Sequence, residues 1–81
     1  MRVAYTPQAT RSLAKAPAHI RKAFFKQVAF LLGDLHHPSL RAKKYDEARD
    51  MWQGHVNDDW RFFFRIVDDV YLVGEIRRHP K

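Results

Sequence analysis

The sequence lacks several features that would place it in a familiar class. It has no cysteine among its 81 residues, which excludes disulfide bonds and thiolate metal sites. No apolar run approaches the roughly 20 residues of a membrane-spanning helix, and no apolar secretory core follows the N-terminus. These absences predict a soluble, cytoplasmic protein with no membrane association, folded as a single small domain over residues 1–81.

Several kinds of catalytic site are missing as well. The five histidines show no metal-ligand spacing, and no pair of carboxylates marks a hydrolytic metal site. There is no nucleophile motif and no glycine-rich loop to cradle a phosphate. We therefore expect neither a metal nor a cofactor.

The chain does have an excess of positive charge. Fifteen Lys and Arg residues against nine Asp and Glu residues give a formal net charge of +6. This balance favours, modestly, a partner that is nucleic acid, an anionic membrane surface or an acidic protein. Plain solubility is the alternative interpretation of the same charge.

The first half of the chain predicts one strand and two helices. Arg2–Tyr5 alternates like a short strand, and Thr6 with Pro7 is a typical start for a helix over Pro7–Lys15. Ala18–Leu35 predicts the strongest helix, because its large apolar residues recur every three or four positions. The segment 36–50 that follows is polar and is predicted to be irregular.

The second half predicts three antiparallel strands, Met51–Val56 and the two arms of a hairpin over Trp60–His79. Together with the first half they predict an α+β fold, in which the helices cover one face of a three-stranded meander. Side chains alternate between the faces of a strand, so Phe62 and Phe64 belong to the covered face and Arg61 belongs to the open one.

This alternation also predicts a register for the hairpin. Residues that oppose each other must share a face, which favours Phe64 opposite Gly74, Ile66 opposite Leu72, and Arg61 opposite Arg77. Such a register requires a three-residue turn over residues 68–70 with a bulge, rather than a two-residue Asp68-Asp69 turn. It also places Tyr71 and Val73 on the face of the arginines.

The open face gathers most of the candidate functional residues. An open face of this kind could bind phosphates through cations, stack a base on a ring and move protons through an imidazole. These are the requirements of RNA cleavage by the neighbouring 2′-hydroxyl. A solvated sheet face partly neutralised by Glu75, or plain binding of RNA or an acidic protein, explains the pattern equally. The residues expected there are Gln53, His55, Arg61, Phe63, Arg65, Arg77 and His79, with Lys43 and Lys44 approaching from the preceding segment.

The order of elements resembles the RelE/ParE superfamily of bacterial type II toxin–antitoxin toxins. The resemblance covers nearly the whole chain, from the Thr6-Pro7 helix start through the Lys43-Lys44 segment to the final histidine. Its more specific parts are the Trp60-Arg-x-x-Phe-Arg-Ile66 segment and His79. Many members place an aromatic residue shortly after the late histidine, whereas Pro80-Lys81 follows here, which leaves Phe63 as the substitute ring.

In the RelE-like branch, the resemblance implies a metal-independent endoribonuclease that cuts mRNA on the ribosome. Arg61 matches the arginine that stabilises phosphate charge, and His79 matches the histidine that transfers protons. Lys44 and Lys43 match the basic segment that contacts RNA and helps activate the 2′-hydroxyl. Arg65 and Arg77 are weaker matches, as phosphate contacts.

The resemblance also implies partners. A cognate antitoxin is expected, with an acidic or amphipathic segment that covers the open face. Besides mRNA and the ribosome, DNA gyrase is an alternative target, because ParE-like members share the fold and inhibit gyrase by protein binding. A catalytically inactive module that binds RNA or antitoxin is the third possibility.

Overall fold

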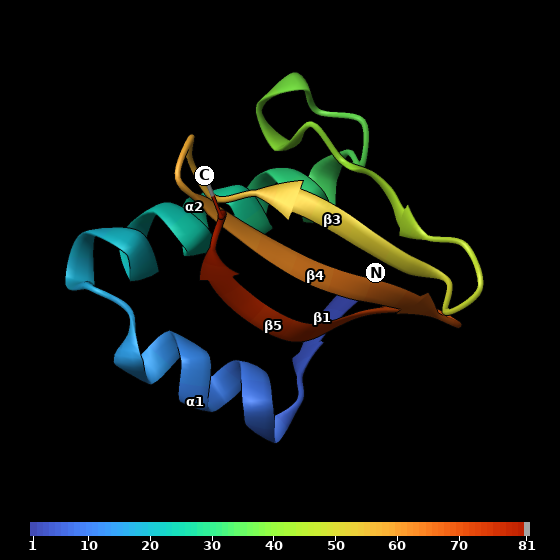
Figure 1. The fold of residues 1–81 in the computed structure, drawn as a ribbon. Coiled ribbons are helices and arrows are strands. Elements are labelled where there is room, and N and C mark those ends of the chain that lie inside the picture. Colours follow the sequence, from blue (N-terminus) through green and yellow to red (C-terminus); the bar gives the residue numbers. More distant parts are fainter. Residues whose placement is uncertain (81) are drawn as a thin grey trace.

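The computed structural model describes residues 1–80 as an α+β structure with a five-stranded sheet (Figure 1). The strand order is β1-β5-β4-β3-β2, with β1 parallel to β5 and the other neighbours antiparallel. The predicted α+β architecture is confirmed; Lys81, the last residue of the predicted domain, lies outside the described residues. The elements are β1 (Arg2–Tyr5), α1 (Pro7–Lys15), α2 (Ala18–Gly33), a 3₁₀ turn (Pro38–Leu40), β2 (Lys43–Asp46), β3 (Met51–His55), β4 (Trp60–Val67) and β5 (Val70–Arg78).

The two helices begin where the sequence predicts. The Thr6 hydroxyl caps α1 by accepting a hydrogen bond from the Ala9 amide at 3.1 Å, and Pro7 occupies the first turn. The helix α2 ends at Gly33, two residues before the predicted end, and its apolar stripe is buried as far as Leu31. No helix within residues 1–80 is long and apolar enough to span a membrane.

The strand β2 corrects the expectation of an irregular segment before β3. Lys43 pairs with Gln53 and Lys44 pairs with Trp52, and the register shifts before Asp46. The sequence of β2 has little apolar alternation of its own, so the strand forms because its backbone pairs with the edge of β3. The pairing sends Lys43 and Lys44 to opposite faces of the sheet.

The β4–β5 register departs from the predicted one at its turn end. Arg61 does oppose Arg77, as expected, but Phe64 opposes Val73 and Ile66 opposes Tyr71. The turn is the two-residue one, with Asp68 in the left-handed region at φ 54°. A two-residue turn was rejected because it would pair residues from opposite faces in a regular hairpin. A bulge inside β5 removes this conflict.

The bulge lies at Gly74. Between the Phe63–Glu75 and Phe64–Val73 pairs, β5 has one residue more than β4. The faces of β5 therefore exchange at Gly74, and Tyr71 and Val73 lie in the core rather than on the face of the arginines, contrary to the prediction. The Gly74 carbonyl accepts a hydrogen bond from the Thr6 hydroxyl at 3.1 Å, so the bulge is joined to the start of α1.

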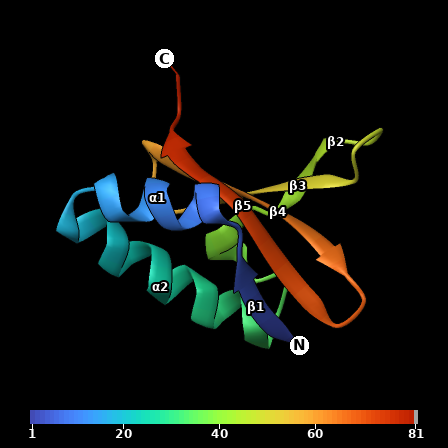
Figure 2. The ribbon, with the colours of Figure 1, turned by 90° about the horizontal axis from the view of Figure 1, so that it is seen from below.

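Both helices gather on one side of the sheet, and its other face is open (Figure 2). The core between them contains the fully buried rings of Phe24, Phe62 and Phe64. Gly54 opposes Phe62, and a Cβ at position 54 would lie 2.6 Å from the Phe62 ring. This packing fixes which side chains remain on the open face.

Candidate functional site

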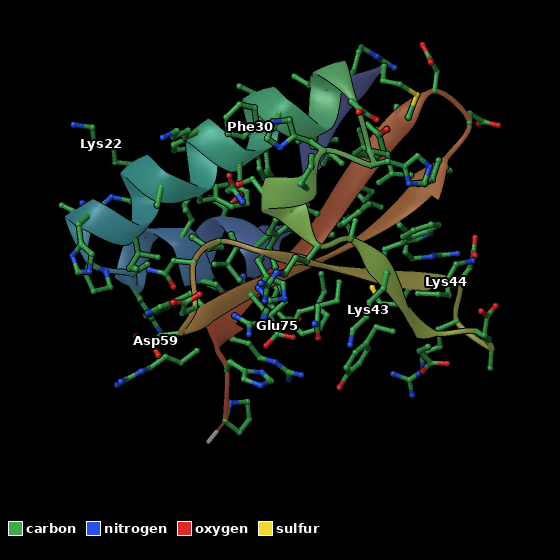
Figure 3. All side chains as sticks on the ribbon, turned by 90° about the horizontal axis from the view of Figure 1, so that it is seen from above. Lys22, Phe30, Lys43, Lys44, Asp59 and Glu75 are labelled. Carbon is green, nitrogen blue, oxygen red and sulfur yellow. The ribbon has the colours of Figure 1, made fainter. Side chains whose placement is uncertain are left out.

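The open face aligns the predicted site residues across three strands. His55 on β3 opposes Arg61 on β4, and Arg61 opposes Arg77 on β5. Figure 3 shows Lys43 and Glu75 on this side of the sheet, away from α2, which Lys22 and Phe30 mark. At the end of β5 the face forms a cleft of about 240 Å³, here called the cationic cleft. The cationic cleft is lined by Tyr45, Gln53, Arg61, Phe63, Arg77, Arg78, His79 and Pro80.

Arg61 has a structural role in addition to lining the cationic cleft. Its Nη1 donates to the carbonyls of Asn57 at 2.8 Å and of Asp58 at 3.1 Å, and this closes the β3–β4 turn. The side chain is buried, yet its Nε has no hydrogen-bond partner. A buried, unpaired guanidinium N–H is unfavourable for folding, so Arg61 holds the turn at a cost in stability.

Arg77 is exposed and rests on aromatic rings. Its guanidinium lies 4.5 Å from the centroid of the Phe63 ring, and its Nη2 donates to the Tyr45 hydroxyl at 3.4 Å. Glu75 approaches the Nη1 of Arg77 to 3.8 Å, as the sequence suggested it could. Phe63 itself is only 5 % exposed, because Arg77 and Tyr45 cover it, so it offers no free face for a base.

The two histidines near the cationic cleft differ in their surroundings. The backbone amide of His79 donates to the Asp59 carbonyl at 2.7 Å. This hydrogen bond fixes the backbone of His79, whose side chain is exposed. The pKa of His55 is lowered from its ordinary value of 6.5, first by burial and then by the nearby positive charges of Arg61, Arg41, Lys43 and His79. His55 is therefore held neutral at pH 7 and can accept a proton.

A buried glutamine positions His55. The Gln27 amide nitrogen on α2 donates to the His55 carbonyl at 2.8 Å and to the Ser39 carbonyl at 3.0 Å. The Gln27 carbonyl accepts from the Ser39 hydroxyl at 2.8 Å. Both ends of this buried side chain are thus satisfied, and they hold the helix, the 3₁₀ turn and the end of β3 together.

Four predicted site residues do not line the cationic cleft, namely Lys43, Lys44, His55 and Arg65, although His55 lies directly opposite Arg61 on the neighbouring strand. Lys44 lies on the face of Trp52, with its Nζ 5.2 Å from that ring, and forms an ion pair with Asp50. The hydrogen bond that Lys44 donates to the Asp50 carboxylate raises the pKa of Lys44, which opposes a role as a base. Arg65 is exposed on β4 beyond the bulge, whereas Lys43 shares the face of Gln53 and His55.

A second and larger cleft adjoins the first. It has a volume of about 610 Å³ and lies between the start of α1 and the β2–β3 hairpin. We call it the mixed cleft, because its lining contains both signs of charge. Its lining residues include Arg11, Arg49 and Arg77 together with Asp46 and Glu75. Tyr45, Phe63 and Arg77 line both clefts and form the wall between them.

The structure adds residues that the sequence reasoning missed. Tyr45 is exposed between the two clefts, and Arg78 lines the cationic cleft at the end of β5. The signal for Tyr45 was its place next to Lys43-Lys44, but only the pairing of β2 shows which face it takes. Within residues 1–80, no three His, Asp or Glu side chains are grouped so as to hold a metal ion.

Comparison with known proteins identifies relatives of the whole chain. The family model described as "ParE toxin of type II toxin-antitoxin system, parDE" matches residues 3–80. No curated protein sequence matches the chain.

Solved structures share the fold over nearly the full length. The YoeB dimer from Staphylococcus aureus matches with a TM-score of 0.81 at 10% identity, covering 99% of this chain and 98% of that one. YafQ from Escherichia coli gives 0.78 at 11%, covering 95% and 91%. The RelBE2 toxin–antitoxin complex from Mycobacterium tuberculosis gives 0.68 at 27%, covering 96% of each chain.

Proposed function

The chain belongs to the ParE toxin family of type II toxin–antitoxin systems, and we propose that this toxin is a metal-independent endoribonuclease that cleaves mRNA at the ribosome and inhibits translation. The observation that supports this is the cationic cleft. Three arginines and an imidazole meet in it, and no acidic side chain within residues 1–80 contributes to its lining. Such a cleft suits a phosphodiester whose charge increases in the transition state.

In the proposed reaction the 2′-hydroxyl attacks the adjacent phosphorus and the 5′-oxygen leaves. Neutral His55 accepts the proton of the attacking hydroxyl, and His79 donates a proton to the leaving oxygen. The guanidiniums of Arg61 and Arg77, which line the cleft, stabilise the phosphorane. Lys43 and Arg65 contact the flanking RNA backbone, and Lys44 has no step in this scheme.

A protein-binding inhibitor of DNA gyrase is the second candidate. The name of the matching family favours it, since that model is named for ParE toxins. The cationic cleft favours RNA, because an inhibitor that acts only by binding has no need of an imidazole beside three arginines. In either case we propose that a cognate antitoxin covers the open face with an acidic segment.

Brief expression of the toxin, followed by primer extension of cellular mRNA, tests the proposal. The wild type should produce new 5′ ends within coding regions, and His79→Ala should abolish them and restore growth. The control is His36→Ala, which removes an exposed imidazole after α2. Circular dichroism of each purified variant checks that its fold is retained. Intact mRNA accompanied by gyrase-dependent DNA breaks would replace the ribonuclease with the gyrase inhibitor.

A further inference from the structure

Tyr45 is the most exposed aromatic side chain on the open face. It is 54 % exposed, whereas the neighbouring Phe63 is 5 % exposed. The two rings meet edge to face at 4.9 Å, and Arg77 donates to the Tyr45 hydroxyl. One edge of Tyr45 is therefore fixed by its neighbours while much of the ring remains in contact with solvent.

The two clefts on either side of Tyr45 differ in charge. The cationic cleft has no acidic lining among the described residues, so it suits a phosphate. The Asp46 and Glu75 carboxylates line the mixed cleft and pair with Arg49 at 3.7 Å and Arg77 at 3.8 Å, so they offset its positive charge and weaken its attraction for a phosphate. A nucleobase has no such charge, and its amino groups can donate hydrogen bonds to carboxylates.

The size and position of the mixed cleft agree with this division. Its volume of about 610 Å³ exceeds that of the cationic cleft, at about 240 Å³. The clefts share Tyr45, Phe63 and Arg77, so a nucleotide with its phosphate in one has its base beside the other.

We propose that the mixed cleft is a nucleobase subsite in which Tyr45 stacks on the base of a nucleotide next to the cleaved phosphodiester. The proposal rests on the proposed ribonuclease activity and adds to it the side chain that binds the flanking base. Stacking on aromatic rings tolerates any base, so Tyr45 contributes affinity and orientation, and neighbouring polar groups contribute preference.

The test combines Tyr45 variants with an altered RNA. Cleavage of an mRNA in ribosome complexes is measured for the wild type, Tyr45→Phe and Tyr45→Ala. Tyr45→Ala should raise KM roughly ten- to hundredfold, the range expected for one stacked base. Tyr45→Phe should stay within about threefold of the wild type, because the ring remains. Phe25→Ala, which removes an exposed ring from α2, serves as the matched control.

The same reactions are repeated with an abasic nucleoside at each position beside the cleaved bond. At one position, loss of the base should slow the wild type roughly tenfold or more and leave Tyr45→Ala unaffected, because the partner ring is already gone. The subsite would be refuted if Tyr45→Ala had the KM of the wild type. It would also be refuted if, at every position, the abasic RNA slowed Tyr45→Ala as much as it slowed the wild type. Neither result would contradict the proposed ribonuclease activity. A wild type that cleaves no RNA would overturn the ribonuclease and the subsite together.

Discussion

The two faces of the sheet divide stability and chemistry between them. The covered face packs the rings of Phe62 and Phe64 against α2, where both are fully buried. The open face sets Arg61 directly opposite Arg77, an arrangement of like charges that destabilises a sheet. A face arranged only for folding would avoid that pair, which supports the proposal that the open face binds an anionic ligand. Because side chains alternate along a strand, a substitution on one face should leave the other face unchanged. Arg61 is the exception, since it both closes the β3–β4 turn and lines the cationic cleft.

The largest expected effect belongs to the covered face. Phe64→Ala should lower the free energy of unfolding by about 3–5 kcal/mol, because it leaves a cavity under a fully buried ring. Urea denaturation followed by circular dichroism measures this loss. Val67→Ala, at an exposed position of the same strand, is the control and should change stability by less than about 1 kcal/mol. Equal losses in the two variants would contradict the division between faces.

Arg77→Ala should produce the opposite result. RNA cleavage should fall on the order of a hundredfold, because a cation beside the phosphate is lost. Stability should change by no more than about 1 kcal/mol, the contribution expected from its contact with the Phe63 ring. Single-turnover cleavage and urea denaturation of the same preparation separate the two effects. Arg2→Ala on exposed β1 is the matched control, and a variant that unfolds as readily as Phe64→Ala would refute the independence of the faces.

Gln27→Leu tests the connection between the faces. It removes the hydrogen bonds from α2 to the His55 and Ser39 carbonyls, and unfolding should become easier by about 1–3 kcal/mol. Because the His55 backbone loses a fixed position, cleavage should fall as well. Lys26→Leu, an exposed neighbour on the same helix, controls for a general change in α2. Loss of stability with unchanged cleavage would show that Gln27 serves the covered face alone.

Lys43→Ala should have the smallest effect, a shift in pH dependence. Removing a positive neighbour raises the pKa of His55 towards its ordinary value of 6.5. If His55 is the base, the acidic limb of the cleavage profile moves to higher pH by the same amount. An NMR titration of the His55 ring measures the pKa directly, with Lys22→Ala on α2 as the control. A shift of the NMR pKa without a shift of the profile would assign the base to another group.

The same lowered pKa makes stability depend on pH. The folded protein binds a proton at His55 less readily than the unfolded chain does, so its contribution to stability is lost as the pH falls through about 6.5.

Much of the fold could be predicted because local signals agree with it. Thr6-Pro7 and the stripe from Ile20 to Leu31 determine the helices, and alternation from Trp60 to Ile66 determines the faces of β4. The strand β2 could not be found, because its own sequence has little apolar alternation and its pairing depends on the edge of β3. The turn was wrong because the parity argument treated β5 as regular, although an isolated glycine within a strand often marks a bulge.

The candidate site was predictable to the extent that it follows alternation. His55, Arg61 and Arg77 were placed on one face, and the structure has them side by side across three strands. The environments of individual side chains were not predictable. The burial of Phe63 under Arg77 and the ion pair of Lys44 with Asp50 depend on contacts between strands that no local pattern encodes.

The bulge at Gly74 acts as a change of phase in the last strand. Before it, the odd-numbered Tyr71 and Val73 point into the core; after it, the even-numbered Ile76 does, and the odd-numbered Glu75 and Arg77 face outward. Deleting this single glycine would let Glu75 follow Val73 directly, so the ladder would become regular and every later side chain would keep its present face. The loss would be local, namely the Gly74 carbonyl that accepts from the Thr6 hydroxyl, so the bulge serves the connection to the start of α1 rather than the placement of Arg77.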